Sequence, residues 1–443
     1  MWWYGEHYDR LDQRLQTRHR RLVREHCHVL NRAATALSTL PGTAQPFAST
    51  LAMSRFLNNP DVTLPALIEP IQDAVRNSLA KSTGPVVLVV HDWSGIHYHD
   101  TRRKRDLYQR SHKHDTGYEL AVALVIETAA GQPLGPMELR LRTADGVLST
   151  RPTKTRCPRG RINELADVME AACDWRVDRP MVHVVDREAD SVDHYRQWSG
   201  NGHTFLVRAD DDRVVKWDGK DVKLSELTKG PGLAWQPVTD GESPVRVTVG
   251  GRAGTLWVAE ASVVLDRPGK KRVEGKRIDV RGEALPLRLV VSWVLGKDGE
   301  VLAEWLLFSN ASRQFDAATL ARWYAWRWRV ETYFKLLKSA GMNAEAWEQH
   351  SGEAVAKRLV IASTACLTVW GLQQERGEQA GEVRRVLVRL SGRQMKYKVE
   401  STAPALLAGL EKLLAVLDLL TDYDLDEIRK LAKRVLPNLF DSG

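Results

Sequence analysis

Two apolar runs, each followed at once by an aspartate, constrain this chain more than any other feature. Val86 to Val90 is a continuous and mostly β-branched run that leads into His91-Asp92. Met181 to Val185 is a second apolar run, and it leads into Asp186. Continuous runs of this kind are typical of strands buried on both faces of a sheet. They predict an α/β fold with an acid at the tip of each strand, where such folds place ligands.

The segments around these runs predict the order of the remaining elements. After the first strand we expect two further strands at Tyr118–Glu127 and Met137–Arg142, and a helix at Ile162–Trp175. Residues 209–299 are rich in Gly, Pro and charge, and their short β-like runs indicate a β-rich insertion. A strand at Leu302–Ser309 and one long helix at Ala317–Ala340 should follow, and residues 352–443 should be mostly helical.

An arginine-rich segment near the N-terminus indicates contact with a polyanion. Residues 8–35 are predicted as a helix, and Arg10, Arg14, Arg18 and Arg21 recur at helical spacing on one side of it. Arg20 and Arg24 widen that face. The formal net charge of +8 agrees with an anionic partner. A solvated surface helix is the alternative, but charge of this density favours contact with phosphates.

A second basic segment lies between the first two predicted strands. Six of the thirteen residues from 102 to 114 are Arg or Lys. Because this loop leaves the strand that ends at Asp92, we expect it to reach a polyanion beside the site. A basic solvated loop is the alternative.

Other classes of protein find little support in the sequence. The four cysteines form no C-x-x-C pair, which argues against a zinc site or a disulfide framework. We find no stretch of 18 or more apolar residues and so expect no membrane span. The N-terminus lacks the apolar core of a signal peptide. A cytoplasmic location is the expectation.

The predicted helix at Ala317–Ala340 offers a third acid. At 100° per residue, Tyr324, Arg327, Glu331 and Lys338 fall within an arc of about 60°, so they share one stripe of the helix. Three carboxylates are hard oxygen ligands of the kind that Mg²⁺ and Mn²⁺ prefer. Two such ions can activate one oxygen and stabilise another during displacement at phosphorus. An amphipathic helix whose Glu331 and Lys338 face solvent remains the alternative.

The spacing Tyr324-x2-Arg327-x3-Glu331-x6-Lys338 resembles the Y-R-E-K signature of bacterial cut-and-paste transposases of the insertion-sequence-four family. Other segments resemble the family in the same order. Val185–Asp190 is similar to its second-aspartate motif, and Asp92 lies where its first aspartate belongs. Phe205–Arg208 is similar to the strand that follows, and Glu304–Leu307 to the strand whose tryptophan takes a flipped base. The arginine-rich helix and Ser54–Asn59 are similar to its end-recognition region.

The resemblance implies a ribonuclease-H-like catalytic core interrupted by a β-rich insertion, with helical regions at both ends. The implied domains are residues 1–75 for DNA-end binding, 76–208 and 300–345 for the core, 209–299 for the insertion, and 346–443 for a helical dimerisation region. The interval of 145 residues from Asp186 to Glu331 is too long for a plain loop, which agrees with an insertion.

The resemblance also implies a role for each matched residue. Asp92, Asp186 and Glu331 are the implied catalytic ligands of two Mg²⁺ ions, with Mn²⁺ able to substitute. Tyr324, Arg327, Lys338 and Arg208 are the implied phosphate contacts near the cut, and Trp305 is the implied platform for an extruded base. Arg14, Arg18 and Arg21 are expected to bind DNA. The implied partners are double-stranded transposon ends, target DNA and a second copy of the chain.

Three functions therefore stand open at the level of sequence. The first is a DNA transposase that cuts transposon ends in a metal-dependent reaction, through a hairpin if the family's mechanism holds, and joins them to target DNA. The second is a catalytically silent, transposase-derived DNA-binding protein, against which the intact acids argue. The third is a hydrolase with paired carboxylates, such as a glycosidase, against which the basic surface and the Tyr-Arg-Lys stripe argue.

Overall fold

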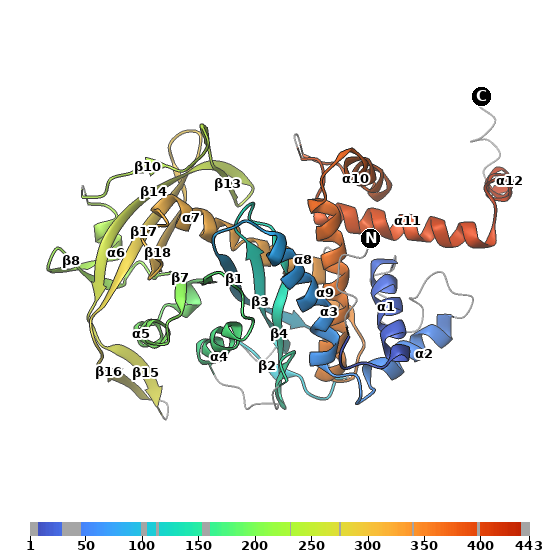
Figure 1. Cartoon of the computed structure of the whole chain (residues 1–443), viewed down its shortest axis with the longest axis horizontal. Helices are drawn as coiled ribbons and strands as arrows, with labels where there is room; N and C mark the ends of the chain where they lie inside the picture. The colour runs from blue at the N-terminus through green and yellow to red at the C-terminus, as the bar shows by residue number, and fades with distance from the viewer. Residues whose placement is uncertain are drawn as a thin grey trace.

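A computed structural model of the chain describes residues 8–28, 46–98, 104–111, 115–152, 160–230, 232–273, 276–338, 341–396 and 399–435. Figure 1 shows a β-rich half and a helical half that meet along one large sheet. The mixed α/β class predicted from the sequence is confirmed.

The sheet is built around two short parallel ladders. Its strand order is β5-β4-β3-β1-β6-β7-β18-β17-β14-β8-β9. Strand β1 (Val87–His97) pairs parallel with β6 (Met181–Val185), which pairs parallel with β7 (Thr204–Arg208). On the other side of β1 the strands run antiparallel, through β3 (Thr116–Glu127), β4 (Pro133–Thr143) and β5 (Gly146–Ser149).

The β-rich insertion is continuous with this sheet. Strand β18 (Val301–Ser309) pairs with β7 on one side and with β17 (Leu285–Leu295) on the other. Beyond β17 lie the long strand β14 (Arg252–Leu265), then β8 (Val214–Trp217) and β9 (Lys220–Lys223). Strands β10 (Gln236–Pro237) and β13 (Arg246–Val249) pair with β14. The short pair β11 (Thr239–Asp240) and β12 (Ser243–Pro244) and the hairpin of β15 (Gly269–Val273) and β16 (Lys276–Val280) form separate two-stranded sheets.

Helices cover both faces of the sheet. Helix α4 (Arg161–Cys173) and α5 (Val192–Gly200) bury apolar side chains such as Met169, Tyr195 and Trp198 against β6, β7 and the insertion. Helices α3 (Leu64–Lys81) and α9 (Gly352–Gln374) both pack against β4, on the side of the sheet where the helical half lies (Figure 1). Helix α3 begins at the cap of Thr63, whose hydroxyl accepts the N–H of Ala66.

The helical half is completed by elements from both ends of the chain. They are α1 (Gln13–His28), α2 (Pro46–Leu57), α10 (Glu378–Ser391), α11 (Ala403–Asp422) and α12 (Leu425–Val435), which confirms the mostly helical C-terminal region. Helix α9 is long and apolar enough to cross a membrane, but 89% of its most apolar window is buried inside the chain. It is therefore packed as the central helix of this half.

Two differences from the sequence prediction lie near the predicted acids. Strand β1 does not end at Asp92 but continues to His97, because β3 pairs with it along its whole length. The long helix is two helices, α7 (Ala317–Trp326) and α8 (Arg329–Leu337), separated by a turn at Arg327-Trp328. Periodicity is nearly unchanged across this turn, so the sequence alone does not reveal it.

Candidate active site

Asp92 and Asp186 lie side by side where the parallel ladder ends. The pairing of β1 with β6 stops at His91 opposite Val185, so each aspartate is the next residue of its strand. Asp186 then caps the short 3-10 helix η1 (Arg187–Ala189), and its carboxylate accepts the N–H of Arg187 at 2.7 Å. The carboxylate of Asp92 accepts the N–H of Trp93 at 2.8 Å. The sheet thus places both acids at the carboxyl edge of β6, although β1 itself continues.

Arg327 joins the two aspartates. One guanidinium nitrogen lies 3.0 Å from Asp92 Oδ2, and the other lies 3.4 Å from Asp186 Oδ2. Arg327 occupies the turn between α7 and α8 and is only 6% exposed. The turn is what lets the side chain reach back across both strands. A guanidinium shared by two carboxylates is a charge-assisted contact, stronger than a neutral hydrogen bond.

Two more of the predicted residues reach Asp186. The hydroxyl of Tyr324 donates to Asp186 Oδ1 at 3.1 Å, and Tyr324 is buried at the end of α7. Arg208, the last residue of β7, brings a guanidinium nitrogen to 4.0 Å from the same oxygen, and about a third of its side chain is exposed. The ring of Trp305 on β18 meets the ring of Tyr324 edge-on, with centroids 5.4 Å apart.

The two carboxyls differ in pKa although they share Arg327. Burial raises the pKa of Asp92 to about 6, against the opposing effects of Arg327 and the Trp93 N–H, and with the charges of Glu331 and Asp186 adding to the rise. Burial also acts to raise the pKa of Asp186. There, however, Arg327, the Arg187 N–H, Tyr324 and Arg208 outweigh it, so its pKa lies below the usual value. Asp186 is therefore the firmly ionised member of the pair.

Glu331 lies on α8, one turn beyond Arg327, and is half-buried. Its charge is felt by Asp92. Its carboxylate does not converge with those of Asp92 and Asp186 into a cluster with all ligand atoms within 4.8 Å. The only such cluster in the described ranges is Asp210, Asp211 and Asp212, on the turn after β7. In this structure Arg327 is the cation that lies between the two aspartates.

Lys338 does not reach the two aspartates. It ends α8, and its ammonium donates to the carbonyl of Gly95 at 2.7 Å and pairs with Glu345 at 3.0 Å. Glu345 in turn accepts the N–H of His97 at 3.2 Å. Lys338 thus ties α8 to the part of β1 that extends beyond Asp92.

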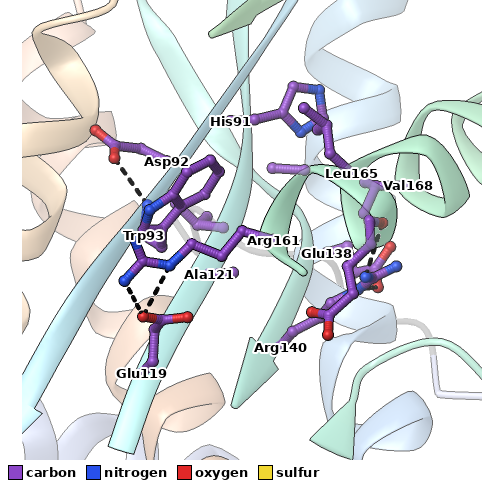
Figure 2. Close-up of a pocket in the computed structure, with 13 residues that line it drawn as sticks. His91, Asp92, Trp93, Glu119, Ala121, Glu138, Arg140, Arg161, Leu165 and Val168 are labelled. Atoms are coloured by element: carbon purple, nitrogen blue, oxygen red, sulfur yellow. Dashed lines mark hydrogen bonds and ion pairs between the residues drawn. The ribbon is translucent and has the colours of Figure 1, made fainter. Parts of the chain in front are cut away.

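Sequence reasoning assigned no role to the network that holds Trp93, the residue after Asp92. The indole N–H of Trp93 donates to Glu188 at 2.7 Å, and Arg161 pairs with the same carboxylate at 2.6 Å. Figure 2 shows Arg161 beside the ring of Trp93 and directed at Glu119 on β3, with which it also pairs. The network links β1, β3 and η1, and so fixes the strand of Asp92 relative to the turn of Asp186. Glu188 lies in the segment Val185–Asp190 that resembles a second-aspartate motif, but no sequence pattern points to Arg161 or Glu119.

Trp328 is a second residue for which no role was predicted. It is 63% exposed, and the guanidinium of Arg327 lies 5.8 Å from the centre of its ring. Trp305, by contrast, is partly buried and packs against the main core. Arg327 is buried and the next residue, Trp328, is exposed. The sequence prediction of one continuous helix gave no indication of this contrast.

Two basic residues of the segment 102–114 bind partners within the chain, whereas Arg105 is exposed, so contact of this segment with a polyanion stays a prediction. Lys104 is buried, and its ammonium donates to the carbonyls of Trp347 and Gln349 at 2.7 and 2.8 Å. Arg110 pairs with Asp115 at 2.6 Å. Neither side chain extends outward, because Lys104 donates to backbone carbonyls and Arg110 pairs with Asp115. Residues 102, 103 and 112–114 lie outside the described residues.

The arginine-rich segment forms one wall of a groove. Helix α1 covers residues 13–28 of the predicted helix, and residues 29–35 lie outside the described residues. Together with α2 it lines a groove of about 710 Å³ whose basic residues are Arg14, Arg18, Arg21 and Arg55. Arg10 and Arg24 are engaged elsewhere, with Glu69 and Asp418.

Comparison with known proteins finds a match to one family model. Residues 161–369 match the family model described as the Transposase DDE domain. The matched segment contains Asp186, Arg208, Trp305 and the Tyr324–Lys338 stripe, but not Asp92. No curated protein matches the sequence. A cryo-EM structure of a piggyBac transposase synaptic complex with hairpin DNA aligns over 96% of this chain and 74% of that chain, at 9% identity and a TM-score of 0.37. So low a score does not establish a shared fold.

Proposed function

We propose that this protein is a DNA transposase that cuts the ends of a transposon and joins them to target DNA. One observation carries the proposal. Asp92 and Asp186 are drawn together by Arg327, with Glu331 one helical turn away, and Asp186, Arg327 and Glu331 lie inside a segment that matches a Transposase DDE domain. The assignment to the insertion-sequence-four family, the domain division predicted from the sequence and a site of action on the bacterial nucleoid belong to the same proposal.

The residues present fit divalent cations. Asp92 and Asp186 turn carboxylate oxygens toward one shared cationic group, and hard oxygen donors of this kind suit Mg²⁺ or Mn²⁺. We assign Asp92, Asp186 and Glu331 as the ligands. Bound there, two such ions would lower the pKa of an attacking water or 3′-OH and stabilise the leaving oxygen. Asp186 is ionised in advance, whereas Asp92 must lose its proton above about pH 6.

The basic and aromatic residues around the acids are assigned to the DNA. Arg208, whose side chain is about a third exposed, would bind a phosphate on one side of the DNA cleavage site. Arg327 would bind a phosphate on the other side. Tyr324 would hold Asp186 in place, and Lys338 would hold β1 in place. Both side chains would also contact the DNA backbone. We assign Trp305 as the platform for a base extruded when the cut end closes as a hairpin, a stack worth roughly 1–3 kcal/mol. Exposed Trp328 is the second candidate for this platform.

The outer elements are assigned to DNA ends and to assembly. The groove with Arg14, Arg18, Arg21 and Arg55 would follow the phosphates of a transposon end. A second copy of the chain would bind through α11, because cutting two ends and joining them in one event needs two sites held together.

The test is metal-dependent cleavage of DNA carrying the transposon end. Glu331→Gln keeps the size of the side chain and removes its charge, so it should bind the end like the wild type and fail to nick it in Mg²⁺. Glu345→Gln, in the short 3-10 helix η2 (Ala344–Ala346) and paired with Lys338 rather than with the aspartates, is the matched control and should retain nicking. Cleavage by Glu331→Gln at the wild-type rate would remove the acid from the site. End binding without cleavage by the wild type would favour the catalytically silent alternative.

The same assay distinguishes a base-stacking role of Trp305 from a role in core packing. If Trp305 is the stacking platform, Trp305→Ala should keep its melting temperature, make the first nick and fail to form the hairpin. If Trp305 is only part of the core, the variant should lose several kcal/mol of stability and fail at every step together. A hairpin defect in Trp328→Ala but not in Trp305→Ala would transfer the role to Trp328.

A further inference from the structure

The hairpin of β15 and β16 is an isolated projection of the insertion. It forms its own two-stranded sheet, from Gly269 paired with Val280 to Val273 paired with Lys276. In Figure 1 it leaves the end of β14 beside α5 and points away from the body of the sheet. A hairpin of this size buries little apolar surface, so core packing does not explain it.

The hairpin is strongly basic. Of the twelve residues from Gly269 to Val280, five are Lys or Arg and two are Asp or Glu. Lys270 and Lys276 are exposed, and within the described part of the chain no ion pair engages either of them. The charges at the root of the hairpin are neutralised instead, because Arg267 pairs with Asp221 at 2.9 Å and Lys216 pairs with Asp266 at 2.5 Å. Unbalanced positive charge is therefore concentrated on the projecting part.

The root of the hairpin is fixed to the helix that follows Asp186. Arg196 on α5 donates to the carbonyls of Leu265, Arg267 and Glu283, at 3.4, 3.1 and 2.7 Å, and so holds both strands where they leave the body. Gly269 packs so closely on the first turn of α5 that a Cβ there would lie 2.9 Å from the Cβ of Asp193. Helix α5 begins at Val192, six residues after Asp186. The root of the hairpin thus packs on α5, while the register of the sheet places Leu265 and Leu285 on the side of the amino end of β7.

We propose that the β15–β16 hairpin binds the phosphate backbone of duplex DNA. A two-stranded ribbon has the width of the major groove, and lysines on such a ribbon can reach the phosphates that border it. Lysine contacts of this kind carry no sequence information, so the hairpin would add affinity and orientation without selecting a sequence. The rigid root matters here, because an anchored ribbon loses less entropy on binding than a free loop. The inference rests on the proposed function, since it assumes that DNA is the substrate.

The experiment measures binding of the full-length protein to random-sequence duplex DNA at several salt concentrations. Lys270→Gln/Lys276→Gln removes two charges from the hairpin. Lys229→Gln/Lys297→Gln removes two exposed charges from the same insertion and is the matched control. Each phosphate contact contributes about 0.9 to the slope of log affinity against log salt, so the hairpin variant should lower that slope by about 1.8 and the control should not. Hydroxyl-radical footprinting should show that only the hairpin variant loses protection of one backbone segment.

The outcomes separate the two proposals. An unchanged slope and footprint in a hairpin variant that melts like the wild type would overturn the role of the hairpin, even if end cleavage is normal. An equal loss of slope in both double variants would also overturn it, because the effect would then be one of net charge. Failure of the wild-type protein to bind or cleave DNA at all would instead contradict the proposed function.

Discussion

At the scale of single residues, the geometry of the site depends on Arg327. Its guanidinium contacts Asp92 and Asp186 and is almost fully buried, so it compensates two carboxylates that would otherwise repel each other across the end of the ladder. The network of Trp93, Glu188, Arg161 and Glu119 also links β1, which carries Asp92, to η1, which Asp186 caps. The acids are thus held in place before any substrate arrives.

Replacing Arg327 by Met should destabilise the protein by about 3 kcal/mol. This is the lower end of the range for a broken buried pair, because Asp186 is partly exposed. The loss should shrink in an Asp92→Asn/Asp186→Asn background, where no carboxylate is left without a partner. Urea unfolding of the four proteins gives the coupling energy. Equal losses in both backgrounds would show that Arg327 acts through packing alone.

The raised pKa of Asp92 predicts a pH dependence of stability. The pKa is about 6 in the folded chain against 3.8 ordinarily, so the folded chain binds this proton more tightly. Its contribution to folding is therefore full below about pH 4 and is lost as the pH rises through 6. The free energy of unfolding of the wild type, measured relative to Asp92→Asn in EDTA, should fall by up to about 3 kcal/mol between pH 4 and 7. Parallel pH curves for the two proteins would contradict the assignment.

The quantity to measure is the difference in free energy of unfolding between the wild type and Asp92→Asn. Other titrating groups change the free energy of unfolding of both proteins. Burial lowers the pKa of His19, His26 and His183 to about 3. Their neutral forms favour folding above pH 6.5, and this contribution is lost as the pH falls toward 3. Both proteins should therefore become less stable in acid overall, while Asp92 acts in the opposite direction.

At the scale of elements, most of the secondary structure followed from the sequence. The apolar runs at Val86–Val90 and Met181–Val185 identified β1 and β6, because only a strand buried on both faces tolerates so many consecutive apolar side chains. The continuation of β1 to His97 could not be foreseen. It depends on β3, a strand 20 residues further along the chain whose register no local pattern encodes.

The candidate site was predictable in composition but not in arrangement. Helical periodicity grouped Tyr324, Arg327, Glu331 and Lys338 on one stripe, but their side chains bind different partners. Tyr324 and Arg327 reach the aspartates, whereas Lys338 binds Gly95. Charge in the sequence was equally ambiguous. Lys104 belongs to a basic loop and yet is buried, because two backbone carbonyls receive its ammonium.

Helix α1 should contribute strongly to the salt dependence of end binding. Arg14 and Arg18 line the groove with Arg55, whereas Arg10 and Arg24 are already paired with Glu69 and Asp418. Arg14→Ala/Arg18→Ala should therefore lower the slope of log affinity against log salt by about 1.8, and Arg10→Ala/Arg24→Ala should lower it less. A gel-shift series with end DNA measures both. Equal slopes for the two variants would mean that the groove faces solvent.

At the scale of the whole molecule, α11 divides into a packed half and a projecting half. Leu406 and Leu407 are buried within the chain, so this part of the apolar sequence expected to pair two copies is used internally. Beyond Glu411 the helix exposes Val416, Leu417, Leu419 and Leu420, and it projects from the body in Figure 1. If two copies pair through α11 as proposed, the apolar surface available to the second copy is therefore the far half of this helix.

Polar substitution of that far half should prevent assembly on DNA. We expect light scattering of the protein with end DNA to show two copies per complex. Val416→Ser/Leu417→Gln should give one copy that still binds an end, because both side chains are exposed and their loss does not disturb folding. A complex with one protomer and one end that still transposes would refute the role of α11.

The continuity of the sheet has a consequence for how such a protein can be divided. Strand β18, which follows the insertion, lies between β7 and β17, so the hydrogen bonds of the core run on into residues 209–299 without a seam. Excising those residues would leave β18 with a row of unsatisfied amides and carbonyls along an apolar edge, and edges of that kind recruit other chains. The insertion therefore cannot be exchanged as a cassette, and shortened versions of this protein should be recovered as aggregates.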